Sequence, residues 1–324
     1  MFRTHKTALI IGINDYKFAP LRGCINDANK MDKMLSKHYD GSPNFQTKLL
    51  TSSESRQITD GFLRGEIENL FKHRVDTALL YFSGHGTTTS LGGYLVTQGA
   101  SASDPGVSFN DVIRYANQSL IPEIIIILDC CHSGHVANWN LTGSEGHNSV
   151  ALIREGVSIL SASRPEQFSL EKNGAGLFTS IICEGLAGGA ADILGEVTVA
   201  NVYANADNLL GPWDQRPILK SHVTKMTPLR YCKPKVERSI IRQLTNYFAK
   251  ADSEHSLDPS YEPTTAPIGD DNEKIFEHLQ IMTAANLIEP VGEKHMYYAA
   301  VNSKSCRLTQ LGKFYWNMVK ANRI

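Results

Sequence analysis

Short runs of apolar residues recur through the first two thirds of the chain, and each run is continuous rather than alternating. The four runs occupy residues 8–13, 78–82, 124–128 and 157–160. Continuous runs of this length are typical of parallel strands that are covered by helices on both faces. The run from Ile124 to Leu128 is the richest in β-branched residues and is bounded by Pro122 and Asp129. It is therefore expected to be a central strand.

Stretches with helical spacing and polar first residues lie between these runs. They occupy residues 24–38, 55–71, 109–117 and 176–186. Strands that alternate with helices in this way predict parallel strands joined by crossover helices. The first part of the chain is therefore expected to form an α/β fold around a mostly parallel sheet.

The pattern changes near the C-terminus. Residues 251–272 are rich in Pro, Ser and Thr and predict an exposed linker. A helix is expected from 273 to 285, then a hairpin through Tyr297 and Tyr298 to Cys306, and a last helix beginning near Thr309. This order resembles a winged helix-turn-helix module. The predicted domains are thus 1–235, a helix and linker at 236–272, and a winged-helix-like α+β module at 273–324.

Composition narrows the class of protein. A length of 324 residues suggests about two domains, and 42% hydrophobic with 20% charged residues excludes a disordered chain. The formal net charge of -1 excludes a whole-protein field that would attract nucleic acid or membrane. The six cysteines show no CxxC spacing, which predicts reduced thiols rather than disulfides or a zinc finger. No apolar run approaches the ~18 residues of a membrane span, so a cytoplasmic protein is expected.

Two predicted strand ends carry reactive side chains. The sequence Ser-Gly-His-Gly places His85 between two glycines, and Asp-Cys-Cys-His-Ser-Gly begins at Asp129. Because the carboxyl ends of parallel strands share one crevice, a Cys and a His there can form a nucleophile and base pair. The oxyanion would need main-chain donors, for which Gly86 and Cys131 are candidates.

These motifs resemble the clan CD cysteine peptidases of family C14, and most closely the metacaspases and bacterial caspase-like proteases. His85 precedes Cys131 by 46 residues, and the segment Leu-Arg-Gly-Cys-Ile-Asn-Asp-Ala at 21–28 is similar to the metacaspase LxGCxNDA pattern. The resemblance covers about residues 6–220. It implies a caspase-like three-layer α/β/α sandwich and thiol protease (hydrolase) activity.

The resemblance also implies roles for individual residues. Cys131 rather than Cys130 corresponds to the nucleophile, with His85 as its partner, and Cys130 is expected to pack inside. Asp27 and Asp129 correspond to the S1 pocket, so the residue before the cleaved bond should be Arg or Lys, with Arg favoured by its two-pronged guanidinium. Further pocket residues are Glu166, Gln167 and Ser169. The expected function is limited proteolysis of a protein substrate, in a regulatory or defence pathway.

Other interpretations of the same residues stay open. Asp27 could brace the first crossover helix, and Asp129 could hold a loop amide. His132 and His135 beside the two cysteines could suggest a metal site. No cofactor is expected to be required. The metacaspase resemblance allows calcium activation, but no EF-hand-type loop is visible, so calcium stays open. Autoprocessing is a further hypothesis, at Arg154, Arg164 or Lys172.

The C-terminal segment is locally basic. Residues 294–324 contain six Lys and Arg and no Asp or Glu. Such a segment could contact DNA phosphates, or it could bind an activating or recognition partner. The alternative functions are therefore a catalytically silent caspase-like scaffold and a winged-helix DNA-binding regulator.

Overall fold

The computed structural model describes residues 5–53, 57–101, 103–130, 152–162, 171–172, 175–210, 217–262 and 270–324, with the main chain alone at 171, 172, 175 and 270. Internal contacts divide the chain into two compact units. Unit 1 comprises Met1–Ala191 and Glu196–Lys233, and unit 2 comprises Asp192–Gly195 and Pro234–Ile324. Within the described part of the chain, no helix is both long enough and apolar enough to cross a membrane.

Unit 1 is built on a six-stranded sheet with the order β12-β8-β7-β3-β1-β2. The strands are β1 (Lys6–Gly12), β2 (Gln46–Thr51), β3 (Thr77–Gly84), β7 (Glu123–Cys130), β8 (Val157–Ser161) and β12 (Ile218–His222). All neighbouring pairs are parallel except β12 with β8. The four predicted strands are confirmed as β1, β3, β7 and β8, and β7 lies inside the sheet as expected.

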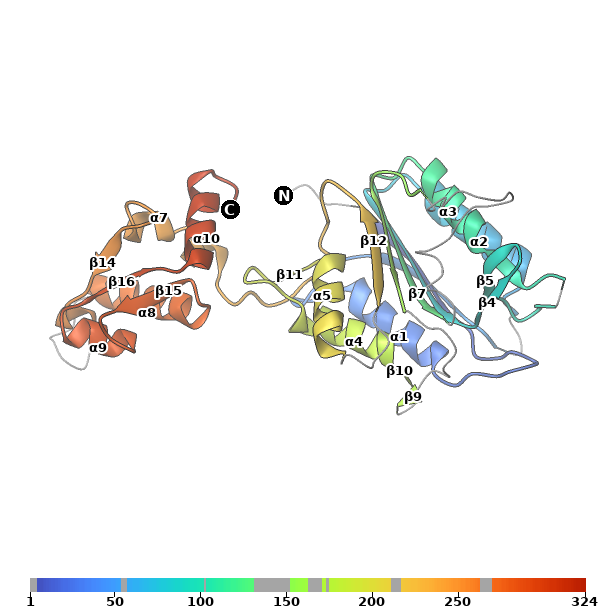
Figure 1. Ribbon diagram of the computed structural model, residues 1–324, viewed down its shortest axis with the longest axis horizontal. Coiled ribbons are helices and arrows are strands. Elements are labelled where there is room, and N and C mark those ends of the chain that lie inside the picture. Colours follow the sequence, from blue (N-terminus) through green and yellow to red (C-terminus); the bar gives the residue numbers. More distant parts are fainter. Residues whose placement is uncertain are drawn as a thin grey trace. The chain divides into compact units, whose positions relative to one another are not determined.

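Helices cover both faces of this sheet (Figure 1). One face packs on α1 (Cys24–Ser36), α4 (Leu177–Glu184) and α5 (Val199–Leu209), and the other on α2 (Asp60–Lys72) and α3 (Phe109–Gln118). Successive strand side chains point to opposite faces, so Leu9 and Ile11 join one hydrophobic cluster while Ala8 and Ile10 join the other. The predicted α/β/α layering with a mostly parallel sheet is confirmed.

The hydrophobic pattern missed several elements of unit 1. The side chains of strand β2, at the sheet edge, alternate between more and less exposed. The sequences of α5 and β12 contain no continuous apolar run. A small antiparallel sheet contains β4 (Gly86–Thr89), β5 (Gly92–Val96) and β6 (Gly106–Ser108). The other elements among the described residues of unit 1 are β9 (Glu171–Lys172), β10 (Ala175–Gly176), η2 (Gly185–Gly189), β11 (Glu196–Val197) and β13 (Arg230–Tyr231).

Unit 2 has its own hydrophobic core around a three-stranded antiparallel sheet, β14-β16-β15. Its elements are α6 (Arg238–Ile241), α7 (Leu244–Tyr247), β14 (Glu254–Ser256), η3 (Pro259–Tyr261), α8 (Asp270–Ala284), β15 (Ile288–Val291), α9 (Met296–Val301), β16 (Ser305–Leu308) and α10 (Gln310–Lys320). Helices α8 and α10 agree with the two expected helices. The winged-helix resemblance itself stays a prediction.

Two expectations for this region are wrong. Tyr297 and Tyr298 lie in helix α9 and not in a hairpin, because the strand that pairs with β15 begins only at Ser305. Residues 251–262 are not an exposed linker, since β14 pairs with β16 and the side chains of Leu257 and Tyr261 are buried in the core of unit 2. A few well-placed apolar side chains outweigh the turn-rich composition here.

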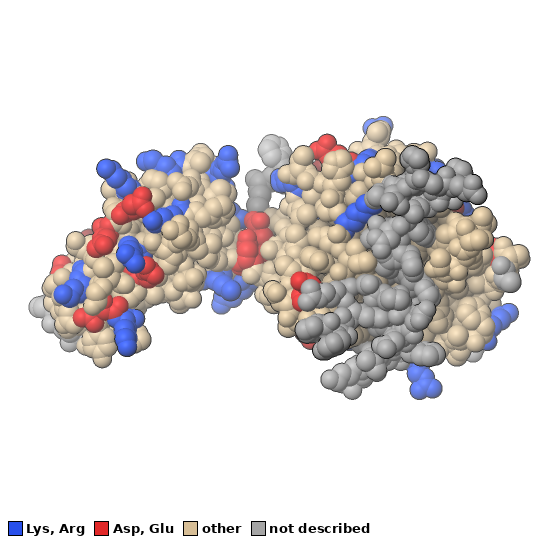
Figure 2. Space-filling model, viewed as in Figure 1, with Lys and Arg blue, Asp and Glu red and all other residues tan. Residues whose placement is uncertain are grey.

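The basic C-terminal segment is partly neutralised by acids from earlier in the chain. Arg307 Nε lies 2.8 Å from Glu289 Oε1, and Lys313 Nζ lies 2.5 Å from Asp252 Oδ1. Figure 2 shows acidic and basic side chains interspersed on the visible face of unit 2. The excess of positive charge in residues 294–324 is therefore smaller on the folded surface than the sequence of that segment suggests.

Candidate active site

The carboxyl ends of β3 and β7 bring the two reactive motifs to one edge of the sheet. The strands are parallel neighbours, with Ser83 opposite Asp129 and Gly84 opposite Cys130. His85 is the next residue after β3. Cys131 is the next residue after β7 in the sequence and lies outside the described residues.

The imidazole of His85 is held by contacts from the loop that follows β1. Its Nε2 lies 2.7 Å from the carbonyl oxygen of Ala19, and its ring centroid lies 4.6 Å from that of Tyr16. A carbonyl oxygen only accepts hydrogen bonds, so Nε2 carries the proton of the neutral ring. The other ring nitrogen, Nδ1, is then the one that can act as a base.

Tyr16 also fixes the main chain at this position. Its hydroxyl accepts a hydrogen bond from His85 N at 3.0 Å and donates to Val96 O at 3.1 Å. Gly84 permits this approach, because a Cβ atom there would lie 2.5 Å from the Tyr16 hydroxyl. The glycine before His85 is therefore required by close packing against Tyr16.

Asp27 and Asp129 converge beside Gly176. Asp27, in the first turn of α1, is 1% exposed and accepts from Gly176 N, with its Oδ2 at 3.0 Å. A Cβ atom on Gly176 would lie 2.8 Å from Asp129 Oδ2 and 3.0 Å from Asp27 Oδ2. The two residues that the family resemblance assigns to one pocket thus border the same small space.

A buried hydroxyl holds Asp129 from the interior side. Thr179 Oγ1 donates to Asp129 Oδ2 at 2.6 Å and lies 2.5 Å from the hydroxyl of Tyr81. Burial raises the pKa of Tyr81 well above its usual value, and the nearby negative charges of Asp129 and Asp27 act in the same direction. Tyr81 is therefore a neutral hydroxyl at any physiological pH.

Comparison with known proteins identifies the family of this chain. The sequence profile of the caspase domain matches residues 5–227, more than half of the chain. The chain belongs to the caspase domain family. The family points to a cysteine peptidase.

Two curated relatives are similar to part of this chain. Metacaspase-4 and Metacaspase-8 of Arabidopsis thaliana are each 30% identical, over 148 and 149 residues. Each match covers 40% of this chain, and 34% and 37% of the respective relative. The matched segment therefore spans little more than a third of the length of these relatives.

Solved structures are similar in fold. Protein GSU0716 from Geobacter sulfurreducens has a TM-score of 0.50 at 16% identity, covering 71% of this chain and 100% of that chain. Caspase-1 from Spodoptera frugiperda has a TM-score of 0.49 at 13% identity, covering 71% and 93%. At 16% identity, the likeness to protein GSU0716 shows the fold alone.

Several predicted site residues of the caspase domain lie outside the described residues. They are Cys131, His132, His135, Arg164, Glu166, Gln167 and Ser169. Lys172 lies in β9, where its main chain pairs with Ala175. Gly86 begins β4 directly after His85 and is half-buried.

Arg154, one of the predicted autoprocessing positions, is anchored in the structure. Its guanidinium donates to the carbonyl oxygens of Ala116 at 2.9 Å and Ile121 at 2.6 Å, and its main-chain N donates to Asn117 Oδ1 at 2.9 Å. Cleavage after Arg154 would first have to break these hydrogen bonds.

The described cysteines of the caspase domain are buried, as expected for Cys130, which is 4% exposed in the core. Burial raises the pKa of Cys183 to about 12. A thiol with such a pKa supplies almost no thiolate at neutral pH. Among the described residues, no group of three or more His, Cys, Asp or Glu could hold a metal ion.

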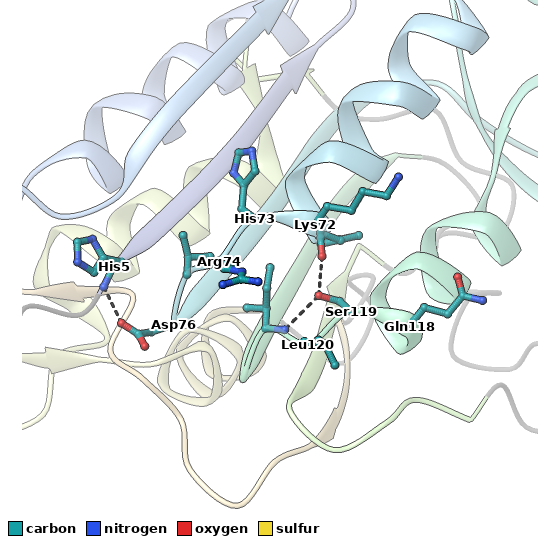
Figure 3. A pocket seen from close by; sticks show the side chains of 11 residues that line it. His5, Lys72, His73, Arg74, Asp76, Gln118, Ser119 and Leu120 are labelled. Atoms are coloured by element: carbon teal, nitrogen blue, oxygen red, sulfur yellow. Dashed lines mark hydrogen bonds between the residues drawn. The ribbon is translucent and has the colours of Figure 1, made fainter.

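A hollow of about 570 Å³ lies at the amino ends of the strands, opposite the end that carries His85 (Figure 3). The loops before β3 and β7 form it, and its lining is His5, residues 71–76 and residues 118–121. Asp76 Oδ2 accepts from His5 N at 2.8 Å, and Ser119 Oγ donates to Phe71 O at 2.6 Å. The full length of β3 separates this hollow from His85, so it is not the predicted catalytic cleft.

The sequence missed two residues of this site. Thr179 lies within the predicted helix 176–186 without any motif around it, and Tyr81 lies within the apolar run 78–82, where the pattern predicts only a buried strand. One signal was available for Tyr81, because a tyrosine inside a fully apolar strand needs a hydrogen-bond partner for its hydroxyl. Nothing in the sequence names Thr179 as that partner.

Proposed function

We propose that this chain is a cysteine endopeptidase that cleaves protein substrates after Arg, or after Lys, by limited proteolysis. One observation carries the proposal: the carboxylates of Asp27 and Asp129 meet beside Gly176, at the sheet edge where His85 lies. Two carboxylates that share one small space favour a cationic group between them. The side chain of a basic P1 residue, the substrate residue before the cleaved bond, is such a group.

Cys131 is the proposed nucleophile. Gly84 and Cys130 are opposite one another in the sheet register, and the residues that follow them are His85 and Cys131. The burial of the described cysteines supports the same choice, because a nucleophile has to reach a substrate. The match of both motifs to the metacaspase pattern is the second support.

The chemistry follows from the tautomer of His85. Nδ1 accepts the proton of the Cys131 thiol, and the thiolate attacks the carbonyl carbon of the scissile peptide bond. The resulting oxyanion would receive main-chain hydrogen bonds from Gly86 and Cys131. The imidazolium then protonates the leaving amine, and water hydrolyses the acyl-enzyme to release the acid product and restore the thiol.

Arg is the preferred P1 residue in this proposal. Its planar guanidinium presents several donors in a fixed fork and can bond two carboxylates at once, whereas the Lys ammonium is a point charge. An Asp side chain at P1 would be repelled by both acids. Glu166, Gln167 and Ser169 complete the lining of the proposed pocket.

The wider role is proposed from the organisation of the chain. A protease with an attached second unit suits one regulatory or defence substrate, recognised or activated through residues 273–324. Free cysteines in both units fit a cytoplasmic protein. Calcium activation is tested in the experiment below. Self-cleavage at Arg154, Arg164 or Lys172 is tested by incubating wild type beside Cys131→Ala, and absence of Cys131-dependent shortening by mass spectrometry would refute it.

The test uses purified full-length protein and fluorogenic peptides that end in Arg, Lys or Asp, with and without calcium. Cys131→Ala and His85→Ala should abolish cleavage, and Asp27→Asn or Asp129→Asn should reduce kcat/KM for the Arg peptide by about 10- to 100-fold. Asp32→Asn, on the same helix as Asp27, is the matched control. Cleavage after Asp alone would refute the pocket, and absence of any Cys131-dependent cleavage would favour a silent scaffold.

A further inference from the structure

A chain of two hydrogen bonds leads from the core of unit 1 to the carboxylate of Asp129. Tyr81 and Thr179 are both fully buried, at 0% exposure. The Tyr81 hydroxyl lies 2.5 Å from Thr179 Oγ1, which lies 2.6 Å from Asp129 Oδ2. Tyr81 comes from β3, Thr179 from α4 and Asp129 from the end of β7.

The direction of the protons in this chain follows from the chemistry of the three groups. The hydroxyl of Thr179 has a single proton, which it donates to Asp129 Oδ2. The Thr179 oxygen then accepts from Tyr81, whose high pKa keeps its own proton in place. Hydrogen bonds that point one way polarise each other, and a donor aimed at a carboxylate favours its charged form.

The first turn of α4 holds both acids of the proposed pocket. Gly176 is the residue before the helix, and its N–H donates to Asp27. Thr179 is the third residue of the helix and donates to Asp129. The positive end of the helix dipole also favours negative charge at this position.

We propose that Thr179, itself held by Tyr81, is the positioning residue that keeps the carboxylate of Asp129 ionised and directed into the S1 pocket, which receives the P1 side chain. The inference rests on the proposed function, because it assigns Asp129 to the binding of a basic P1 side chain. Thr179 does not touch the substrate. Its effect passes through the orientation and charge of Asp129.

A purely structural role would give a different result from a positioning role. If Thr179 and Tyr81 only fill the core, their substitution lowers stability and affects every active-site property alike. If Thr179 positions Asp129, its substitution weakens binding of the basic side chain while the reactivity of Cys131 stays the same. The acid limb of the pH profile also moves, because a hydrogen-bond donor favours the charged form of a carboxylate and the variant lacks that donor.

The experiment compares wild type with Thr179→Val, Thr179→Ser and Tyr81→Phe, and uses Ser180→Ala, on the same helix, as the control. Each protein is assayed for kcat and KM with an Arg peptide across the acid limb of the pH profile. The rate of alkylation of Cys131 by iodoacetamide is measured in parallel, by mass spectrometry, since this small reagent does not use the P1 pocket.

Thr179→Val is expected to raise KM by about 10- to 100-fold and to move the acid limb to higher pH, with alkylation of Cys131 unchanged. Thr179→Ser keeps the hydroxyl and should stay close to wild type. Tyr81→Phe should shift KM in the same direction by a smaller factor, about 3- to 10-fold. If Thr179→Val does not fold, Tyr81→Phe decides, because it changes a single oxygen atom.

A KM for Thr179→Val or Tyr81→Phe that equals wild type would overturn the inference. Equal losses in kcat/KM and in alkylation would overturn it too, because they indicate general collapse of the site. If wild type is alkylated at Cys131 yet cleaves neither Arg nor Lys peptides, the proposed function fails, and the role of Thr179 fails with it. The wild-type measurement therefore distinguishes failure of the proposed function from failure of the Thr179 inference alone.

Discussion

Asp27 and Asp129 direct their carboxylates at the same space, although one lies on the first helix of the chain and the other at the end of a central strand. Gly176 borders that space and donates its N–H to Asp27. A methyl group on Gly176 would fill the space, with its carbon 2.8 Å from Asp129 Oδ2. The proposed specificity for basic residues therefore depends on a residue without a side chain.

Gly176→Ala is expected to lower kcat/KM for an Arg peptide by about 100-fold, because the added Cβ displaces both carboxylates. Steady-state kinetics measures the effect. Gly99→Ala is the matched control, since nothing lies within 4 Å of a Cβ there. Equal activity of the two variants would contradict the assignment of this space to the substrate.

Tyr16→Phe tests how His85, the proposed base, is held. The Tyr16 hydroxyl accepts from His85 N and donates to Val96 O, and the side chain is 2% exposed. Removing the hydroxyl leaves these two groups without that partner and should cost about 1–3 kcal/mol in the free energy of unfolding. We expect kcat to fall by about 10-fold with KM unchanged, because the base moves while the pocket stays intact.

Urea unfolding and steady-state kinetics measure the two effects of Tyr16→Phe. Tyr39→Phe is the control, because the side chain of Tyr39 is 49% exposed. A Tyr16→Phe protein with wild-type kcat would show that the hydroxyl does not position His85.

Two glycines of unit 1 should respond to alanine in opposite ways. Gly65 lies inside α2, and nothing lies within 4 Å of a Cβ there. Gly65→Ala should raise the free energy of unfolding by about 0.5–1 kcal/mol, because alanine restricts the unfolded chain and favours the helix. Gly84→Ala should lower it, because its Cβ would meet the Tyr16 hydroxyl. Urea unfolding decides, and a stabilised Gly84→Ala protein would contradict the observed packing.

His38 makes the stability of unit 1 sensitive to acid. Burial lowers the pKa of His38 from 6.5 to about 4, and the positive charge of Lys6 adds to the effect. Its Nδ1 accepts a hydrogen bond from Tyr231 N at 3.1 Å, which requires the unprotonated ring. Between pH 6.5 and pH 4 the unfolded chain therefore binds more protons than the folded one, and stability falls as pH falls.

His38→Asn removes this titration, while an amide oxygen can still accept from Tyr231 N. Urea unfolding across the same pH range should show a shallower loss of stability in His38→Asn than in wild type. Identical slopes in the two proteins would show that His38 does not carry the effect.

The accuracy of the sequence predictions differed between regions for physical reasons. The runs at β1, β3, β7 and β8 were visible because strands buried on both faces must be apolar throughout. The edge strand β2 was not visible, because its burial alternates. Near the C-terminus, turn-rich composition predicted a linker, whereas pairing with β16 and the burial of Leu257 order that segment.

The sequence by itself determined the layered α/β fold, the family and the position of His85 at a strand end, since these depend on local pattern and on motifs of adjacent residues. Only the tertiary structure decided which groups meet around that position. Sheet register and the packing of α4 against the sheet give four residues their proposed roles in the site: Tyr16, Gly176, Thr179 and Tyr81. Such contacts join residues far apart in the chain, and the hydrophobic effect that drives the packing does not specify them individually.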